Sequence, residues 1–88
     1  MQITYEASFK RDYKKWKKQN PSKDKLLTQV INLFLEDPFH PLLKTHKLKG
    51  NLKECYAFTV EYDLRIIFYF EDASHTVFLS LGKHDEVY

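Results

Sequence analysis

The longest apolar run of the chain is Leu64-Arg65-Ile66-Ile67-Phe68-Tyr69-Phe70, in which Arg65 is the one charged residue. A run without alternation, bounded by acidic residues, is typical of a strand that is covered on both faces. We therefore expect residues 64–70 to form the central strand of a small sheet. Because a buried guanidinium is costly without a partner, Arg65 is expected at the rim of that sheet or in a cleft that binds an anion.

Apolar residues at helical spacing lie ahead of this strand. In the first such segment they recur at i, i+4 and i+7 with basic residues between them, which predicts a helix from about Phe9. The recurring residues are Phe9, Tyr13 and Trp16. Ser8 is the candidate N-cap, and Asn20-Pro21-Ser22 should end the helix.

A second helix is predicted to begin at a Ser22 cap and to run to about Glu36. Its apolar face is Leu26, Leu27, Val30, Ile31, Phe34 and Leu35. A turn with two prolines follows at residues 37–41. The two helices are expected to pair as an antiparallel hairpin.

The remaining β-prone segments complete the fold. Residues 3–5, 55–60 and 75–81 are predicted to be strands, with tight turns at 61–63 and 71–74 and with Gly82 ending the last strand. Residues 42–53 form a basic connector. The order β-α-α-β-β-β predicts an α+β fold, in which an N-terminal helical hairpin packs on a small, mainly antiparallel, twisted sheet. At 88 residues the chain should be a single domain over residues 1–88.

Composition indicates a folded protein and the compartment in which it works. The hydrophobic fraction of 43% favours a folded domain over disorder. The single cysteine, Cys55, excludes an intramolecular disulfide and fits a structural thiol in a reducing cytoplasm. Residues 1–6 lack the features of a signal peptide, and no apolar run approaches the ~20 residues of a membrane span. We therefore expect a cytoplasmic protein without a membrane partner.

Charge is distributed unevenly along the chain. Residues 1–53 hold 12 Lys and Arg against 5 Asp and Glu, whereas residues 54–88 hold 2 against 7, which gives the net charge of +2. A basic half suggests a polyanion or an acidic protein as partner. A solvated, lysine-rich helix face explains the same composition. Four dispersed histidines and one cysteine show no spacing of metal ligands, so no metal and no other cofactor is expected.

Three segments, in this order, resemble the RelE/ParE superfamily of toxins from bacterial type II toxin–antitoxin systems. His46-Lys47-Leu48-Lys49-Gly50 is similar to the H-x-L-x-G segment of the YafQ branch. Asp63-Leu64-Arg65-Ile66-Ile67-Phe68 resembles the central strand with its arginine. Leu81-Gly82-Lys83-His84-Asp85-Glu86-Val87-Tyr88 resembles the C-terminal tail and is the most specific of the three.

The resemblance implies an activity and partners. It is strongest to the RelE/YafQ mRNA interferase branch, whose members cleave mRNA on the ribosome without a metal and leave 2′,3′-cyclic phosphate ends. It also implies a cognate antitoxin that neutralises the toxin, binding of the complex to operator DNA through the antitoxin, and contacts of the basic helix and loop with rRNA. A DNA gyrase poison of the ParE type, and a catalytically weakened member that serves as antitoxin-binding partner and corepressor, remain as alternatives.

The resemblance also places site residues. Arg65 falls where the family holds phosphate, and His84 falls on the catalytic histidine of the YafQ type. Tyr88 matches the terminal aromatic residue. Asp63 and His46 match an acid and a histidine of the YafQ site. Lys47, Lys49 and Lys83 are the expected RNA-binding lysines.

Three positions depart from the family pattern. Thr59 stands where YafQ-type members have a second histidine, Ser80 where they have an arginine, and Leu64 where they have an aromatic residue. The site would therefore hold fewer cations and one fewer acid–base group than its relatives, which motivates the alternative of a weakened member.

The chemistry explains why these residue types are needed. A base removes the proton of the 2′-hydroxyl, cations stabilise the charge of the phosphorane, and an acid protonates the leaving 5′-oxygen. Histidine suits either proton transfer, and the planar fork of arginine suits phosphate. Because adjacent antiparallel strands run in opposite directions, Arg65 and residues 80–84 should share one edge of the sheet.

Overall fold

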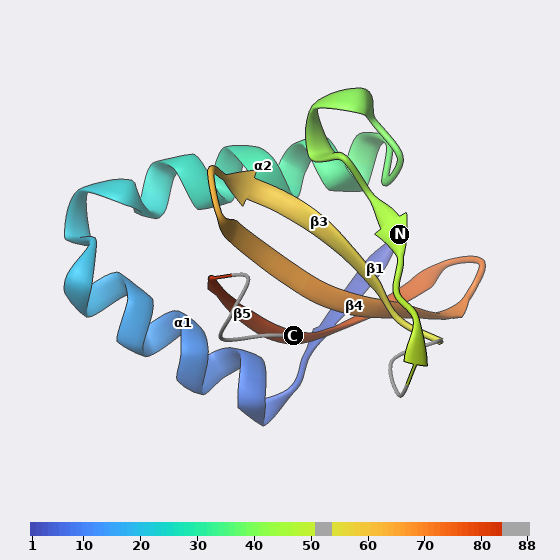
Figure 1. Cartoon of the computed structure of the whole chain (residues 1–88), viewed down its shortest axis with the longest axis horizontal. Helices are drawn as coiled ribbons and strands as arrows, with labels where there is room; N and C mark the ends of the chain where they lie inside the picture. Colours follow the sequence, from blue (N-terminus) through green and yellow to red (C-terminus); the bar gives the residue numbers. More distant parts are fainter. Residues whose placement is uncertain (51–53, 84–88) are drawn as a thin grey trace.

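The structure is a computed structural model that describes residues 1–50 and 54–83. Its helices are α1 (Ala7–Gln19) and α2 (Asp24–Glu36), with short 3-10 helices η1 (Pro21–Lys23) and η2 (Pro41–Leu43). Its strands are β1 (Gln2–Tyr5), β2 (His46–Lys47), β3 (Tyr56–Glu61), β4 (Leu64–Asp72) and β5 (His75–Lys83). The sheet order is β1-β5-β4-β3-β2 (Figure 1). Only the β1–β5 pair is parallel, so the mainly antiparallel α+β fold is confirmed.

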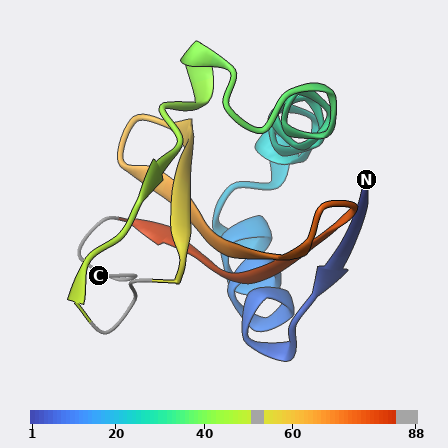
Figure 2. The same ribbon diagram turned by 90° about the vertical axis from the view of Figure 1, so that its right-hand side faces the viewer.

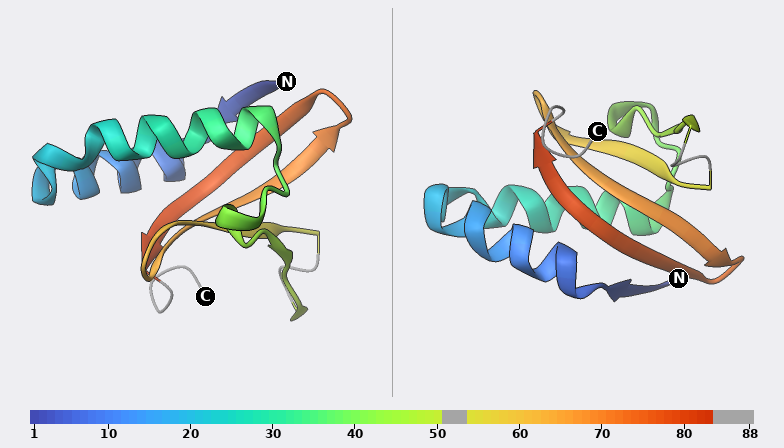
Figure 3. Two further views of the ribbon diagram at one scale, coloured as in Figure 1. Left: turned by 90° about the horizontal axis from the view of Figure 1, so that it is seen from above. Right: turned by 60° about the horizontal axis from the view of Figure 1, so that its bottom comes forward.

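Strand β4 lies at the centre of the sheet, as its apolar run predicts. Both helices lie on one face of the sheet, and β2 lies at the far edge from β1 (Figure 2, Figure 3). Ile66 and Phe68 of β4 are fully buried in the core on the helix side. Ile67, which points to the other face, is only 2% exposed. The prediction of a strand buried on both faces therefore holds in its middle.

An aromatic cluster joins α2 to the sheet. The ring of Phe34 lies 4.8 Å from that of Phe58, 5.0 Å from that of Phe68 and 5.4 Å from that of Phe78, measured between centroids. Phe34 therefore contacts all three long antiparallel strands at once. Burial of such rings supplies much of the stability of a domain this small. The aromatic residues of α1 also lie in or against this core, as predicted.

The predicted helix caps are wrong. No side chain caps α1, whose N-cap is Glu6, and the Ser8 hydroxyl instead donates to the carbonyl of Leu79 on β5. Ser22 lies inside η1, so α2 begins at Asp24 without a side-chain cap. Serine is a favourable N-cap residue at both positions. The contact with β5 gives Ser8 another role, and the proline-led turn η1 includes Ser22.

The helical hairpin opens from its junction rather than pairing along its length. α1 and α2 diverge from η1, and α1 follows β5 while α2 crosses toward β3 (Figure 1). Near the junction the Tyr13 hydroxyl donates to Asp24 at 2.6 Å. This hydrogen bond raises the pKa of Tyr13. No helix in residues 1–50 and 54–83 is long and apolar enough to cross a membrane.

Helix α1 completes the outer edge of β5 beyond the reach of β1. The parallel pairing ends at Tyr5–Phe78, and the Glu6 amide donates to the Phe78 carbonyl at 3.1 Å. One turn into α1, the Asp12 carboxylate accepts from the Leu81 amide at 3.0 Å. Side chains of the helix therefore satisfy backbone groups of β5 that a neighbouring strand would otherwise pair. They also hold the end of β5 in place.

Strand ends differ from the predicted ones, and one short strand was not predicted. β5 continues through Gly82 to Lys83, so the prediction that Gly82 ends the strand is wrong. Pairing with β4 causes this, because Gly82 lies opposite Arg65 and Lys83 opposite Leu64. β4 likewise extends to Asp72. The two-residue strand β2 lies within the predicted connector and forms through its pairing with β3.

Candidate functional site

The face of the sheet away from the helices carries Arg65 of β4, the predicted phosphate-binding residue. Thr59, Arg65 and Gly82 are direct cross-strand partners and form one row. Directly opposed residues of antiparallel strands have their side chains on the same face. Arg65 and Thr59 therefore lie side by side, and the backbone of the buried Gly82 lies opposite Arg65 on the β5 side.

A second row extends this face to the edge of the sheet. His46 of β2 pairs with Ala57, Ala57 with Ile67, and Ile67 with Ser80. The two rows are neighbours along the strands, so the Cα atoms of His46 and Arg65 lie on the order of 12 Å apart. His46 lies in the segment predicted to be a connector, yet the short strand β2 places this histidine on the face of Arg65.

Arg65 is the only permanently charged side chain in these two rows. Its side chain is half-buried, and within residues 1–50 and 54–83 no carboxylate forms a salt bridge with it. The alternative role for Arg65 is a structural ion pair with Asp63 or Asp85. Asp63 forms no such pair, and Asp85 lies outside the described residues. Thr59 and Ser80 are both uncharged and half-buried beside it. A half-buried guanidinium on an otherwise neutral surface attracts an anion such as a phosphate.

Asp63 lies in the turn between β3 and β4, at the end of the sheet where β4 begins and where Arg65 lies. Its φ angle of 65° is in the left-handed region, which aspartate tolerates better than most residues. The tight connection predicted at residues 61–63 is thus confirmed, and the backbone requirement of the turn is a sufficient reason for an aspartate there. The same turn exposes Tyr62, whose side chain is 98% exposed.

The three predicted RNA-binding lysines do not share one surface. Lys47 pairs with Tyr56, so it alternates to the opposite side of β2 from His46. Lys49 is exposed in the loop that follows β2. Lys83 is opposite Leu64 on the helix side, at the end of β5. His84 and Tyr88, the predicted catalytic histidine and terminal aromatic residue, lie outside the described residues.

A polar cleft of about 800 Å³ lies between the second half of α1 and this end of the sheet. The β3–β4 turn and the last residues of β5 line it from the other side. Its charged lining residues are Asp12, Lys15, Lys23, Glu61 and Lys83. Neither Asp12 nor the exposed Tyr62 is a candidate in the sequence analysis, because both acquire their place only from the packing of α1 against β5.

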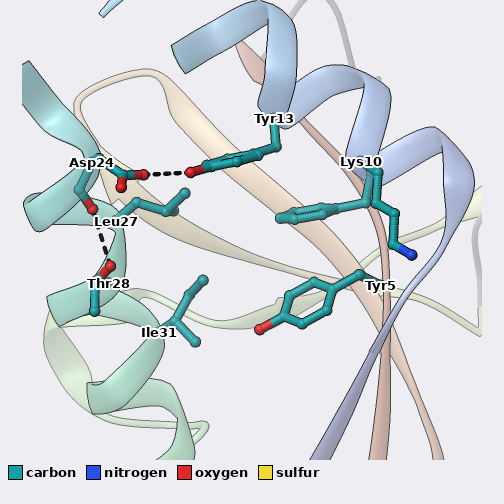
Figure 4. A pocket seen from close by; sticks show the side chains of 8 residues that line it. Tyr5, Lys10, Tyr13, Asp24, Leu27, Thr28 and Ile31 are labelled. Atoms are coloured by element: carbon teal, nitrogen blue, oxygen red, sulfur yellow. Dashed lines mark hydrogen bonds between the residues drawn. The ribbon is translucent and has the colours of Figure 1, made fainter. Parts of the chain in front are cut away.

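A second, apolar cavity of about 290 Å³ lies between the diverging helices (Figure 4). Tyr5, Phe9 and Tyr13 line it from β1 and α1, and Leu27 and Ile31 line it from α2. Burial raises the pKa of the Tyr5 hydroxyl. Among the described residues, no three His, Cys, Asp or Glu side chains are grouped so that they could hold a metal ion.

Comparison with known proteins decides the family. A family model described as the bacterial toxin of type II toxin–antitoxin systems, YafQ, matches residues 1–88. The chain belongs to the YafQ toxin family. No curated protein gives a significant match.

Solved structures agree with this assignment of a YafQ toxin. A metal-bound toxin from Helicobacter pylori is 30% identical with a TM-score of 0.81, and the similarity covers 100% of this chain and 99% of that chain. YafQ from E. coli strain BL21(DE3) is 20% identical with a TM-score of 0.81, over 98% and 96% of the two chains. The toxin in an E. coli DinJ–YafQ complex is 24% identical with a TM-score of 0.76, over the same shares. The resemblance stated from the three segments, including the RelE/YafQ branch, is therefore confirmed.

The lone thiol of this YafQ toxin, Cys55, is half-buried next to β3. Burial raises its pKa, and the neighbouring carboxylate of Glu54 adds to the shift. A raised pKa leaves little thiolate at neutral pH. This agrees with the prediction of a structural thiol rather than a nucleophile.

Proposed function

We propose that this toxin is a metal-independent, ribosome-dependent mRNA endoribonuclease that leaves 2′,3′-cyclic phosphate ends. The observation that carries the proposal is the position of Arg65 on the sheet face opposite the helices. It is half-buried, without a carboxylate partner among the described residues, and beside the backbone of Gly82. A guanidinium in this setting suits the non-bridging oxygens of a scissile phosphate, whose charge grows in the transition state.

The proton transfers are assigned to residues around this arginine. His84 directly follows Lys83 in the sequence, and we assign it the protonation of the leaving 5′-oxygen. His46 and Asp63 are the candidates to accept the proton of the 2′-hydroxyl. Tyr88 is assigned to stack on a base or to donate its hydroxyl. Lys47, Lys49 and Lys83 would contact RNA phosphates.

The partner proposals follow from the family. The related E. coli YafQ forms a complex with DinJ, described as a toxin–antitoxin complex. We infer that a cognate antitoxin neutralises this toxin and that their complex binds operator DNA through the antitoxin. The lysine-rich face of α1 and the loop after β2 are proposed to contact rRNA, because both are basic and exposed.

A weakened member of the family is the second candidate function. Thr59 is the direct neighbour of Arg65, and Ser80 lies one row away on the same face, so the two uncharged substitutions fall inside the site. A site with one arginine and without the second histidine would stabilise the phosphorane less well. Such a protein would still bind its antitoxin and act as a corepressor. A ParE-like gyrase poison would not need His46 or the tail residues His84 and Tyr88.

Primer extension on a reporter mRNA after brief induction in cells tests the proposal. Wild type should produce cuts inside the translated frame, and Arg65→Ala should abolish them. Lys25→Ala is the control, because Lys25 is an exposed basic residue of α2 that no proposed RNA contact uses. Growth arrest with intact mRNA would favour the gyrase poison. The absence of both growth arrest and mRNA cuts would favour the weakened member.

A further inference from the structure

Tyr62 has an exposure that the fold does not require. It is 98% exposed at the tip of the β3–β4 turn, and no aromatic ring in residues 1–50 and 54–83 packs against it. The left-handed conformation that closes the turn is adopted by Asp63, so the turn places no demand for a large ring at the preceding position. A fully exposed phenol ring presents a flat face on which a nucleic-acid base can stack.

The ring lies at the mouth of the polar cleft described above. Tyr62, Lys15 and Lys83 are among its lining residues, contributed by the turn, by α1 and by the end of β5. Both carboxylates of the cleft are already engaged, since Asp12 accepts from the Leu81 amide at 3.0 Å and Glu61 binds Lys23 at 3.0 Å. Because Lys23 is the partner of Glu61, Lys15 and Lys83 are the other lysines of the described lining, and polar side chains of α1 and Ser80 add hydrogen-bonding groups.

An exposed aromatic ring beside lysines is the combination that binds single-stranded nucleic acid, through base stacking and phosphate contacts. The position relative to Arg65 fits such a ligand. Tyr62 is three residues from Arg65, so their Cα atoms lie at most ~10 Å apart along the chain. Arg65 does not line the cleft and lies on the other face of the sheet, so a strand that meets both residues passes from the cleft over the β3–β4 turn.

We propose that Tyr62 and the cleft beneath it form a subsite for single-stranded RNA next to the scissile phosphate. Tyr62 stacks on the base of a neighbouring nucleotide, and Lys15 and Lys83 contact the phosphates of the segment that lies in the cleft. This inference rests on the proposed ribonuclease function, because the strand that enters the cleft is the one whose phosphate Arg65 binds. The subsite positions the RNA and takes no part in the proton transfers.

Trp16 makes occupation of the cleft measurable. It lines the cleft, is 9% exposed, and is the only tryptophan of the chain. A short single-stranded RNA with 2′-O-methyl riboses cannot be cleaved and serves as the probe. Titration with this RNA should change the Trp16 fluorescence of the wild-type protein to a saturating value. A wild-type protein whose fluorescence does not respond to the RNA would overturn the proposal.

The variants separate stacking from charge. Tyr62→Ala should weaken binding roughly tenfold, and Tyr62→Phe should keep it, because stacking needs the ring and not the hydroxyl. Lys15→Gln should weaken binding and make it less dependent on salt. Lys14→Gln is its matched control, because Lys14 is an exposed lysine of the same helix that does not line the cleft. Equal affinities of wild type and Tyr62→Ala would contradict the proposal.

Failure of the subsite and failure of the nuclease assignment are distinguishable. If Arg65→Ala abolishes the mRNA cuts but Tyr62→Ala leaves RNA affinity unchanged, the toxin is a nuclease without this subsite. If the mRNA stays intact in all variants while Tyr62→Ala and Lys15→Gln weaken RNA binding, the cleft binds RNA and the nuclease assignment is wrong.

Discussion

Arg65 and Gly82 lie directly opposite each other on β4 and β5, on the face of the sheet that the helices leave open. The pairing depends on the continuation of β5 past the point where its sequence suggests an end. At the other edge of β5, Asp12 accepts from the Leu81 amide. A contact between a helix and a strand edge thus lies next to the pair that includes the proposed phosphate-binding arginine.

A side chain at position 82 should impair the site without unfolding the protein. In the Gly82→Val variant the new side chain falls beside Arg65 on the same face. We expect cleavage of mRNA to fall roughly 10²-fold, since a displacement of about 1 Å in a catalytic group has effects of this size. Cleavage assays with circular dichroism as the folding control measure this. A fully active, folded Gly82→Val protein would show that the stem of Arg65 needs no such space.

Replacement of Thr59 by histidine should restore an acid–base group next to Arg65. The two residues are direct cross-strand partners, so the imidazole would lie on the same face. Acid–base catalysis contributes about 10²–10⁴-fold, and we expect Thr59→His to raise the rate of mRNA cleavage towards the lower end of that range. Thr59→Val, which keeps the size but not the polarity, is the control. Equal rates for the two variants would mean that position 59 does not face the reacting phosphate.

Removal of the Asp12 carboxylate should destabilise the end of β5. In Asp12→Ala the part-buried Leu81 amide loses its acceptor, which costs about 1–3 kcal/mol of the free energy of unfolding. Asp12→Asn keeps an acceptor oxygen and should lose less. Urea denaturation of the three proteins measures the difference. Stability equal to wild type in Asp12→Ala would show that solvent replaces this hydrogen bond without cost.

The core should depend strongly on Phe34. Its side chain is fully buried and meets rings of β3, β4 and β5, so Phe34→Ala should cost about 3–5 kcal/mol. Leu35, the next residue, is 38% exposed, and Leu35→Ala should change the free energy of unfolding much less. Thermal denaturation of both variants checks this, and comparable losses would contradict the assignment of Phe34 to the centre of the core.

The Cys55 thiol should react slowly in the folded protein. Its pKa is raised by burial and by the carboxylate of Glu54, so the reactive thiolate is scarcer at a given pH than in the unfolded chain. Reaction with a disulfide reagent at neutral pH should accelerate when urea unfolds the protein. The rate in the folded protein should also keep rising with pH above the ordinary pKa of a free thiol. A native rate that matches the unfolded one would rule out this protection.

The sequence alone predicts the central strand, the two helices and the order of the elements, because these follow from local periodicity. The run from Leu64 to Phe70 is apolar on both faces, and the acids that bound it mark its ends. The turn at Tyr62 and Asp63 is equally local. The family resemblance then predicts that Arg65 belongs to a functional site.

Features that depend on contacts distant in sequence are not predicted. Ser8 has the residue type of a cap, but its hydroxyl is taken by a carbonyl of β5. Gly82 has the residue type of a strand end, but pairing with β4 carries the strand through it. β2 has only two residues and no periodicity of its own, and it exists because β3 pairs with it. The cleft at Tyr62 arises in the same way from the packing of α1 against β5.

The most direct test of the account is cleavage of an mRNA bound in the ribosomal A site by purified toxin, with one 2′-deoxynucleotide placed at the mapped cut. The account predicts that the all-ribose mRNA is cut to a 2′,3′-cyclic phosphate end and that the 2′-deoxy substitution abolishes the cut, because the attacking 2′-hydroxyl is gone. Cleavage that persists in the 2′-deoxy mRNA, or an mRNA that stays intact in both forms, would contradict it.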